Sequence, residues 1–191
     1  MGVTMLTESG NTAEWQQLVQ DAGDYAGTRL DEELESYLVF LLMRYLRRPE
    51  MVQRVLALDY LRAQSLQQSR RGEPLQEVAD QCLLLSGLFP RRAERRRVQL
   101  HYYVDLGRSA YLDLAQLVSQ WAALYQRMAR EFIDVMDTLQ GLRRMGGGPA
   151  MSLMQAVELG PVYRSASARR VLEEATGSEV TLLHTLPGTL Q

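Results

Sequence analysis

Residues 31–46, DEELESYLVFLLMRYL, place apolar side chains around most of the circumference of a helix. Acidic residues stand at its start, where they stabilise the positive end of the helix dipole, and Pro49 follows its end. A helix that is apolar on most of its sides must be buried. We therefore expect this helix at the centre of the core of an all-α protein.

Helical periodicity continues on both sides of this segment. Capping residues, glycines and prolines divide it into further helices at about 12–23, 50–69, 75–88, 98–117 (interrupted near Gly107), 118–145, 150–159 and 165–175. Apolar and polar residues alternate over 179–186, which predicts an extended tail. The pattern predicts a compact, bundle-like all-α domain of about seven or eight helices.

Gly146-Gly147-Gly148-Pro149 is the clearest linker signal in the chain. Such a segment permits either a sharp reversal or a hinge. We expect a main helical domain over residues 1–145, a linker over 146–149, and a C-terminal helical appendage and tail over 150–191 that pack on the main domain.

Composition indicates an ordinary globular protein of 191 residues, 46% hydrophobic and 23% charged. A single cysteine, Cys82, excludes an internal disulfide, and its apolar neighbours predict a buried packing residue. The sequence shows no leader peptide at residues 1–10 and no apolar run near the roughly 20 residues that a membrane span needs. We expect a cytoplasmic protein without membrane contact.

The chain has no lysine, and all 21 of its cationic residues are arginine. This excludes a lysine Schiff base, a pyridoxal phosphate anchor and a P-loop lysine. Together with a single isoleucine, it is typical of a GC-rich bacterial genome.

Charge is distributed unevenly along the chain. Residues 1–36 contain eight acids and one arginine, whereas residues 37–97 contain twelve arginines and six acids. Three interpretations stay open: the two blocks lie side by side within one monomer, they meet across a dimer, or the basic face binds an anionic partner.

The densest basic segment follows Pro90 and consists of Arg91, Arg92, Arg95, Arg96 and Arg97. Guanidinium groups at this density repel one another unless anions intervene, and each can bind phosphate through two hydrogen bonds. The segment is therefore either a solvated turn paired with the acidic N-terminal residues or a binding site for an anionic ligand or a protein partner. A pI near 5.8 and the lack of a recognisable motif argue against nucleic acid.

A second candidate site comprises His101, Tyr102, Tyr103 and Asp105. His101 and Asp105 are four residues apart, so the acid can orient the imidazole on a helix. The segment is either part of an enzymatic pocket or a set of packing tyrosines beside a hydrogen-bonded histidine.

Other catalytic or metal-binding patterns are weak. Glu131, Asp134 and Asp137 share one predicted helix face and form either a magnesium site or a solvated acidic stripe. The sequence lacks the spacing of zinc ligands and the Gly-x-Ser-x-Gly motif. We predict no metal and no cofactor, and we lean against an enzyme.

Our leading functional hypothesis is a non-enzymatic helical interaction or regulatory module that forms a homodimer or binds another protein. Met145, Met151 and Met154 flank the glycine linker, where they either pack in the core or furnish an adaptable apolar surface for a partner helix. The alternatives are an anion-binding module at Arg91–Arg97 and an enzyme at His101–Asp105.

Overall fold

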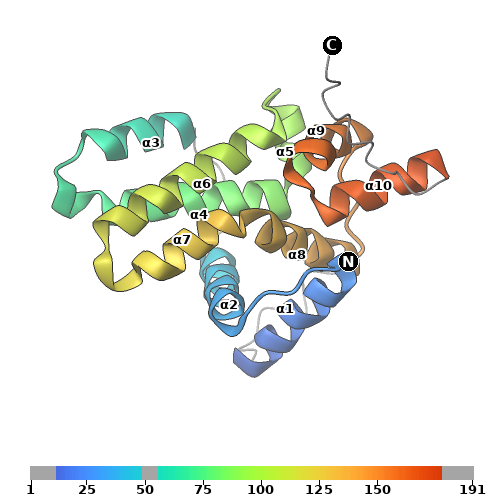
Figure 1. Ribbon diagram of the computed structural model, residues 1–191, viewed down its shortest axis with the longest axis horizontal. Coiled ribbons are helices and arrows are strands. Elements are labelled where there is room, and N and C mark those ends of the chain that lie inside the picture. The colour runs from blue at the N-terminus through green and yellow to red at the C-terminus, as the bar shows by residue number, and fades with distance from the viewer. Residues whose placement is uncertain (1–11, 49–55, 178–191) are drawn as a thin grey trace, which may run out of the picture.

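The computed structural model describes residues 12–48 and 56–177, which form an all-α fold (Figure 1). The α-helices are α1 (Thr12–Ala26), α2 (Glu32–Arg47), α3 (Leu56–Ser65), α4 (Gly72–Gly87), α5 (Pro90–Arg95), α6 (Leu100–Leu117), α7 (Ala122–Arg130), α8 (Phe132–Met145), α9 (Leu153–Tyr163) and α10 (Ala166–Thr176). The predicted all-α class is confirmed, with ten α-helices in the described residues instead of seven or eight. Pro49 and the predicted extended tail lie outside the described residues.

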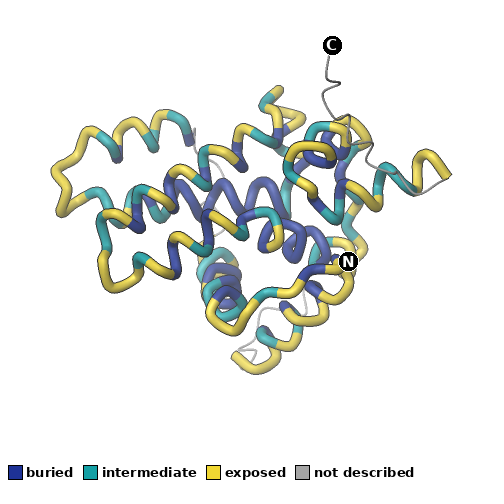
Figure 2. Tube along the Cα trace, in the orientation of Figure 1, coloured by how far each residue is buried: buried dark blue, intermediate teal, exposed yellow. Residues whose placement is uncertain are grey.

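Helix α4 occupies the centre of the molecule, a place that the apolar pattern of residues 31–46 predicts for α2 instead. Every residue from Val78 to Gly87 is buried, and α4 packs against α3, α5, α6 and α8 (Figure 2). Helix α2 buries one face through Leu34, Leu38 and Leu41, but Phe40 is 62% exposed. Helix α2 is therefore apolar over a larger part of its circumference than its neighbours bury.

The remaining helices pack in pairs around this centre. Helix α1 lies on α8, α7 lies on α6, and α9 and α10 form a helical hairpin that contacts α6 and α8. Figure 1 shows α3 and α10 at opposite ends of the long axis of the molecule. The predicted division at 146–149 into a main domain and an appendage stays a prediction.

Local capping signals place two of the helix starts correctly. The Asp31 carboxylate accepts hydrogen bonds from the backbone N–H groups of Glu33 and Leu34, and the Ser165 hydroxyl accepts one from Ala168. Gly177 ends α10 with a φ of 65°, a conformation that favours glycine. These interactions involve only neighbouring residues, which is why the sequence predicts them.

Three predicted breaks are wrong, and one break lies where the sequence predicts a continuous helix. Helix α4 begins at Gly72 and accommodates Pro74 in its first turn, where a missing N–H is tolerated. Helix α6 runs through Gly107, and α9 runs through Gly160 and Pro161. The single helix predicted over 118–145 is instead split into α7 and α8 at Glu131.

Gly107 marks a close approach between helices, not an interruption of α6. A Cβ atom at this position would lie 2.6 Å from the Phe132 ring and 2.9 Å from Cys82 Cβ. The glycine therefore allows α6 to pack directly on α4 and α8. Cys82 itself is fully buried, as predicted, and burial raises its pKa.

A fully buried carboxylate, Asp80, joins α4 to α2 and α6. Its Oδ1 atom accepts hydrogen bonds of 2.7 Å from the hydroxyls of Tyr37 and Tyr111, and its Oδ2 atom pairs with the Arg44 guanidinium. Burial raises the pKa of Asp80, while Arg44 and the two hydroxyls act in the opposite direction. This network holds three helices in register through a group that is costly to bury without its partners.

Within the described residues, no helix combines the length and apolar character that crossing a bilayer requires.

Candidate functional site

The predicted arginine cluster lies on the short helix α5 and the turn that follows it. Arg92 stacks 4.6 Å from the centre of the Phe89 ring, and burial raises the pKa of Tyr103 although a hydrogen bond from Arg96 acts in the opposite direction. Arg91 and Arg95 project from α5 as exposed side chains. Arg92 and Arg96 thus contact different aromatic side chains, and Arg97 is exposed like Arg91 and Arg95.

The pairing of this cluster with the acidic N-terminal block, one of the interpretations left open by the sequence, is not formed by Asp31 and Glu33. Asp31 and Glu33 instead pair with Arg127 of α7, whose Nη1 atom lies 2.7 Å from Glu33 Oε2. Those acids are therefore neutralised within the monomer, but by an arginine outside the basic block. The basic residues on α5 receive no such neutralisation from them.

The side chains of the second predicted site diverge toward different neighbours. His101 Nδ1 lies 2.7 Å from Glu158 Oε1 on α9, whereas Asp105 accepts hydrogen bonds of 2.9 and 3.0 Å from the Tyr163 hydroxyl. Tyr103 is buried and Tyr102 is 38% exposed. Asp105 does not orient the imidazole as predicted. Both polar residues instead attach α6 to α9.

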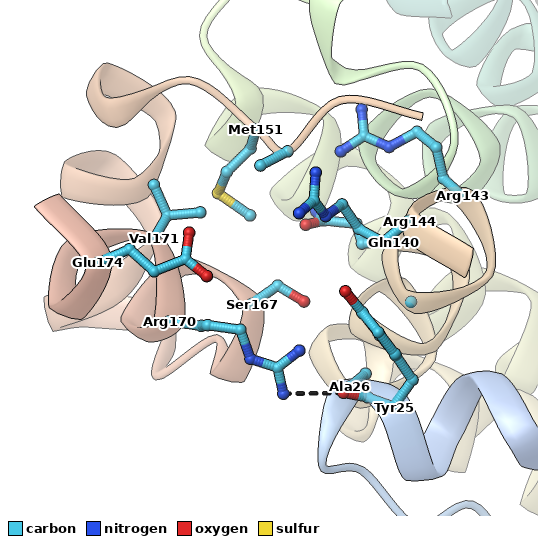
Figure 3. A pocket seen from close by; sticks show the side chains of 12 residues that line it. Tyr25, Ala26, Gln140, Arg143, Arg144, Met151, Ser167, Arg170, Val171 and Glu174 are labelled. Carbon is cyan, nitrogen blue, oxygen red and sulfur yellow. Dashed lines mark hydrogen bonds between the residues drawn. The ribbon is translucent and has the colours of Figure 1, made fainter. Parts of the chain in front are cut away.

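A different set of residues forms a recess where the ends of α1 and α8 meet α10 (Figure 3). Its lining is Tyr25, Ala26, Gln140, Gly141, Arg143, Arg144, Ala150, Met151, Ser167, Arg170, Val171 and Glu174. The charged residues of this lining are therefore three arginines and one glutamate. Figure 3 shows the hydroxyls of Tyr25 and Ser167 and the guanidinium of Arg144 turned toward its centre.

Arg143 is the most unusual group of this recess. Its Nε and Nη2 atoms are buried and have no hydrogen-bond partner within the described part of the chain. Burial, together with the nearby charges of Arg144 and Arg91, lowers the pKa of Arg143 to about 10. A guanidinium that lacks both hydrating water and a neighbouring negative charge is costly to bury, so binding of an anion beside it would be favourable.

The glycine segment after α8 fixes Arg143 in place. Gly147 adopts a φ of 76°, and the Gly148 N–H donates a 2.8 Å hydrogen bond to the Arg143 carbonyl. A Cβ atom at Gly148 would lie 2.5 Å from Arg143 Cγ, so the loop fits closely around the arginine stem. Whether this segment also acts as a hinge stays a prediction.

The other two arginines of the recess each have one backbone partner. Arg170 Nη2 donates a 2.8 Å hydrogen bond to the Tyr25 carbonyl, and the Arg170 Cζ atom lies 5.2 Å from the centre of the Tyr25 ring. Arg144 Nη1 donates a longer bond of 3.3 Å to the Gly148 carbonyl. Neither forms an ion pair within the described residues. Both guanidinium groups therefore keep donors for a ligand.

The size of the recess restricts what it can hold. Its cavity volume is about 30 Å³, against roughly 10–15 Å³ for a single water molecule. A tetrahedral or planar oxyanion fits such a space. The positively charged lining and the small volume together favour a single phosphate, sulfate or carboxylate group.

The predicted acidic stripe is not one solvated face. Asp137 is fully buried on α8 and bonds to the start of α10, and Glu131 lies at the break between α7 and α8. Over residues 12–48 and 56–177, the structure brings together no group of three or more side chains suited to holding a metal ion.

No protein-family model, curated protein or solved structure matches this chain. The chemistry of the recess therefore stands on its geometry alone.

Proposed function

We propose that this chain is a binding module for an anionic ligand, and that an oxyanion group of the ligand binds at the recess between α1, α8 and α10. The observation that carries the proposal is Arg143, a partly buried cation with two unpartnered nitrogen atoms and two cationic neighbours. A bound oxyanion supplies both the missing acceptor and the missing negative charge. The proposed site thus consists of Arg143, Arg144 and Arg170, whereas the sequence suggests Arg91–Arg97. The positive charge of Arg91 adds to the electrostatic potential at the proposed site.

The first prediction concerns the response to inorganic phosphate. At constant ionic strength, phosphate at about ten times its dissociation constant stabilises the native state by roughly 1.4 kcal/mol. For a chain of this size that free energy raises the melting temperature by about 3–5 °C. We expect Arg143→Met to abolish this response without lowering the melting temperature of the free protein, because methionine replaces a desolvated charge.

A matched control is Arg95→Met, which removes an exposed arginine of the predicted α5 cluster. We expect this variant to respond to phosphate like the wild type. Equal loss of response in both variants would assign the effect to general surface charge. A wild-type protein that shows no shift beyond that of sodium chloride would contradict the proposal.

A second candidate function is self-association through α9, in line with the leading sequence hypothesis. Met154, Val157 and Val162 are 77%, 54% and 76% exposed, and Leu153 adds a fourth exposed apolar side chain. The only charged residue of α9, Glu158, bonds to His101. A face without charges meets no like-charge repulsion from its own copy, which suits a two-fold symmetric dimer. Of the flanking methionines, Met151 is buried and Met145 is 41% exposed.

The prediction for this second function is a dimer that dissociates when α9 carries a charge. We expect light scattering coupled to size exclusion to give twice the chain mass for the wild type. Met154→Asp should yield a monomer, because two carboxylates would face each other across the symmetry axis. Leu61→Asp, at an apolar α3 position with 62% exposure, should remain dimeric. A monomeric wild type at all concentrations would refute self-association.

A cytoplasmic location is part of this proposal. It is supported by the single free cysteine, Cys82, which is buried and has no disulfide partner in the sequence.

A further inference from the structure

A second cavity lies between α3 and α4, at the opposite end of the molecule from α10 (Figure 1). Its volume of about 410 Å³ falls within the roughly 300–1,000 Å³ that is usual for small-molecule sites. Val78, Ala63 and Leu66 supply apolar walls, while Asp59, Glu77 and Gln81 supply oxygen atoms. This cavity is far larger than the arginine recess, and the charged residues of its lining are two carboxylates, Asp59 and Glu77, and one arginine, Arg62.

The side chain of Gln81 is the main indication that this cavity binds a ligand. The residue is only 2% exposed, and its Oε1 atom has no hydrogen-bond partner in the described part of the chain. Leu83, Leu84 and Leu85 follow it on the buried helix α4, so an apolar side chain would suit this position in the fold. A buried acceptor without a donor destabilises the native state. A ligand that donates a hydrogen bond would remove this penalty.

Each of the two carboxylates of the cavity forms an ion pair with an arginine. Asp59 Oδ1 lies 3.5 Å from Arg62 Nη1, and Glu77 Oε1 lies 3.9 Å from Arg48 Nη2. The side chains of these two arginines are 77% and 53% exposed, whereas those of Asp59 and Glu77 are 24% and 25% exposed. The carboxylates are thus the more enclosed partners. The polar interior therefore favours a positively charged donor over an anion.

We propose that this cavity binds a small molecule that carries a protonated amine on an apolar body. The ammonium group donates to Gln81 Oε1 and lies near the carboxylates of Asp59 and Glu77, and the apolar body packs against Val78 and Leu66. A primary ammonium provides three donors and no acceptor, which matches an interior where acceptors predominate. This site is separate from the arginine recess and does not depend on the anion-binding proposal.

Phenethylamine is a suitable probe, with phenethyl alcohol as its uncharged counterpart. We expect millimolar phenethylamine to raise the wild-type melting temperature by about 2–4 °C, and the alcohol to bind at least tenfold more weakly by calorimetry. Gln81→Leu should melt above the wild type without ligand, because it removes the unpartnered acceptor, and should lose the response to amine. Asp59→Asn tests the electrostatic contribution and should weaken amine binding several-fold.

Two results would overturn this inference. One is a wild-type protein that binds phenethylamine no better than the alcohol. The other is a Gln81→Leu variant that keeps its affinity for the amine, or that melts below the wild type because the glutamine serves the fold itself. Arg143→Met should bind the amine normally and Gln81→Leu should respond normally to phosphate, so either site can fail without the other.

Discussion

Replacing Arg44 with methionine is expected to lower the free energy of unfolding by about 3 kcal/mol at pH 8, the low end of the range for removing one partner of a buried ion pair, because the Arg44 side chain is 36% exposed and solvent screens its charge. The variant leaves the Asp80 carboxylate in the core of α4 with two tyrosine hydroxyls and no cation. Methionine approximates the length of the arginine stem, so the loss reports mainly on the charge. Urea denaturation followed by circular dichroism measures it directly.

The pH dependence of this loss distinguishes a charge effect from lost packing. Burial already raises the pKa of Asp80, and Arg44 is the strongest influence in the opposite direction. Without Arg44 the carboxyl group binds a proton more readily, and a neutral carboxylic acid is less costly to bury. We therefore expect the destabilisation by Arg44→Met to shrink as the pH falls from 8 to 5.

Arg47→Met provides the control, because Arg47 lies on the same helix but is exposed. Its effect on the free energy of unfolding should stay within about 0.5 kcal/mol, as for most surface substitutions. An Asp80→Asn substitution should be less destabilising in the Arg44→Met background than in the wild type, since the two residues interact. A loss below 1 kcal/mol for Arg44→Met at every pH would contradict the importance of the pair.

How much of this fold the sequence predicts depends on the range of the interactions involved. The starts of α2 and α10 depend on Asp31 and Ser165 bonding to residues two or three positions away, so both could be predicted. The break at Glu131 has no glycine or proline. It separates α7, which packs on α6, from α8, which packs on α1 and α4. A change of packing partner leaves no local signal.

Gly107 shows why the role of a glycine within a helical pattern cannot be predicted from the sequence alone. In a sequence, a glycine within a helical pattern indicates a weak point, because it lowers helix propensity. In the structure the same residue is the contact point of three helices, and the benefit of its missing side chain depends on Phe132, 25 positions later. Only the tertiary structure distinguishes the two roles.

The recess was missed for a related reason. Tyr25, Arg143 and Arg170 come from three separated segments, and no spacing rule joins them. The only local signal is Arg143-Arg144 followed by Met145 and three glycines, which combines two cations with a segment able to wrap around them. The sequence favours the cluster at Arg91–Arg97 because the density of arginines is visible in the sequence. The burial that distinguishes Arg143 can be seen only in the folded structure.

The stability of the protein is also expected to increase as the pH falls from 8 toward 4.5, because of Asp137. This carboxyl group is fully buried on α8, where it accepts hydrogen bonds of 2.7 Å from the Ser165 hydroxyl and from the Ala166 N–H at the start of α10. Burial raises its pKa to about 6, although these hydrogen bonds act in the opposite direction. An unfolded aspartate titrates near 3.9.

The sign of the effect follows from which state binds protons more tightly. Between about pH 4 and pH 6 the native state is protonated at Asp137 while the unfolded state is not. The stabilisation is therefore complete below the unfolded pKa and is lost as the pH rises through the native pKa of about 6. A difference of roughly two pKa units corresponds to about 3 kcal/mol in the free energy of unfolding.

Asp137→Asn isolates this contribution, since asparagine keeps an acceptor for α10 but does not titrate. Burial also raises the pKa values of Asp80 and Asp134, so the wild-type curve alone combines several groups. Their contributions cancel in the difference between wild type and variant, measured by urea denaturation from pH 4.5 to 8. We expect the wild type to lose stability relative to Asp137→Asn over this range, with the steepest change at about pH 5, midway between the unfolded and native pKa values, and little further change above about pH 7. A difference that is independent of pH would mean that the pKa of Asp137 is the same in the native and unfolded states, and it would contradict this prediction.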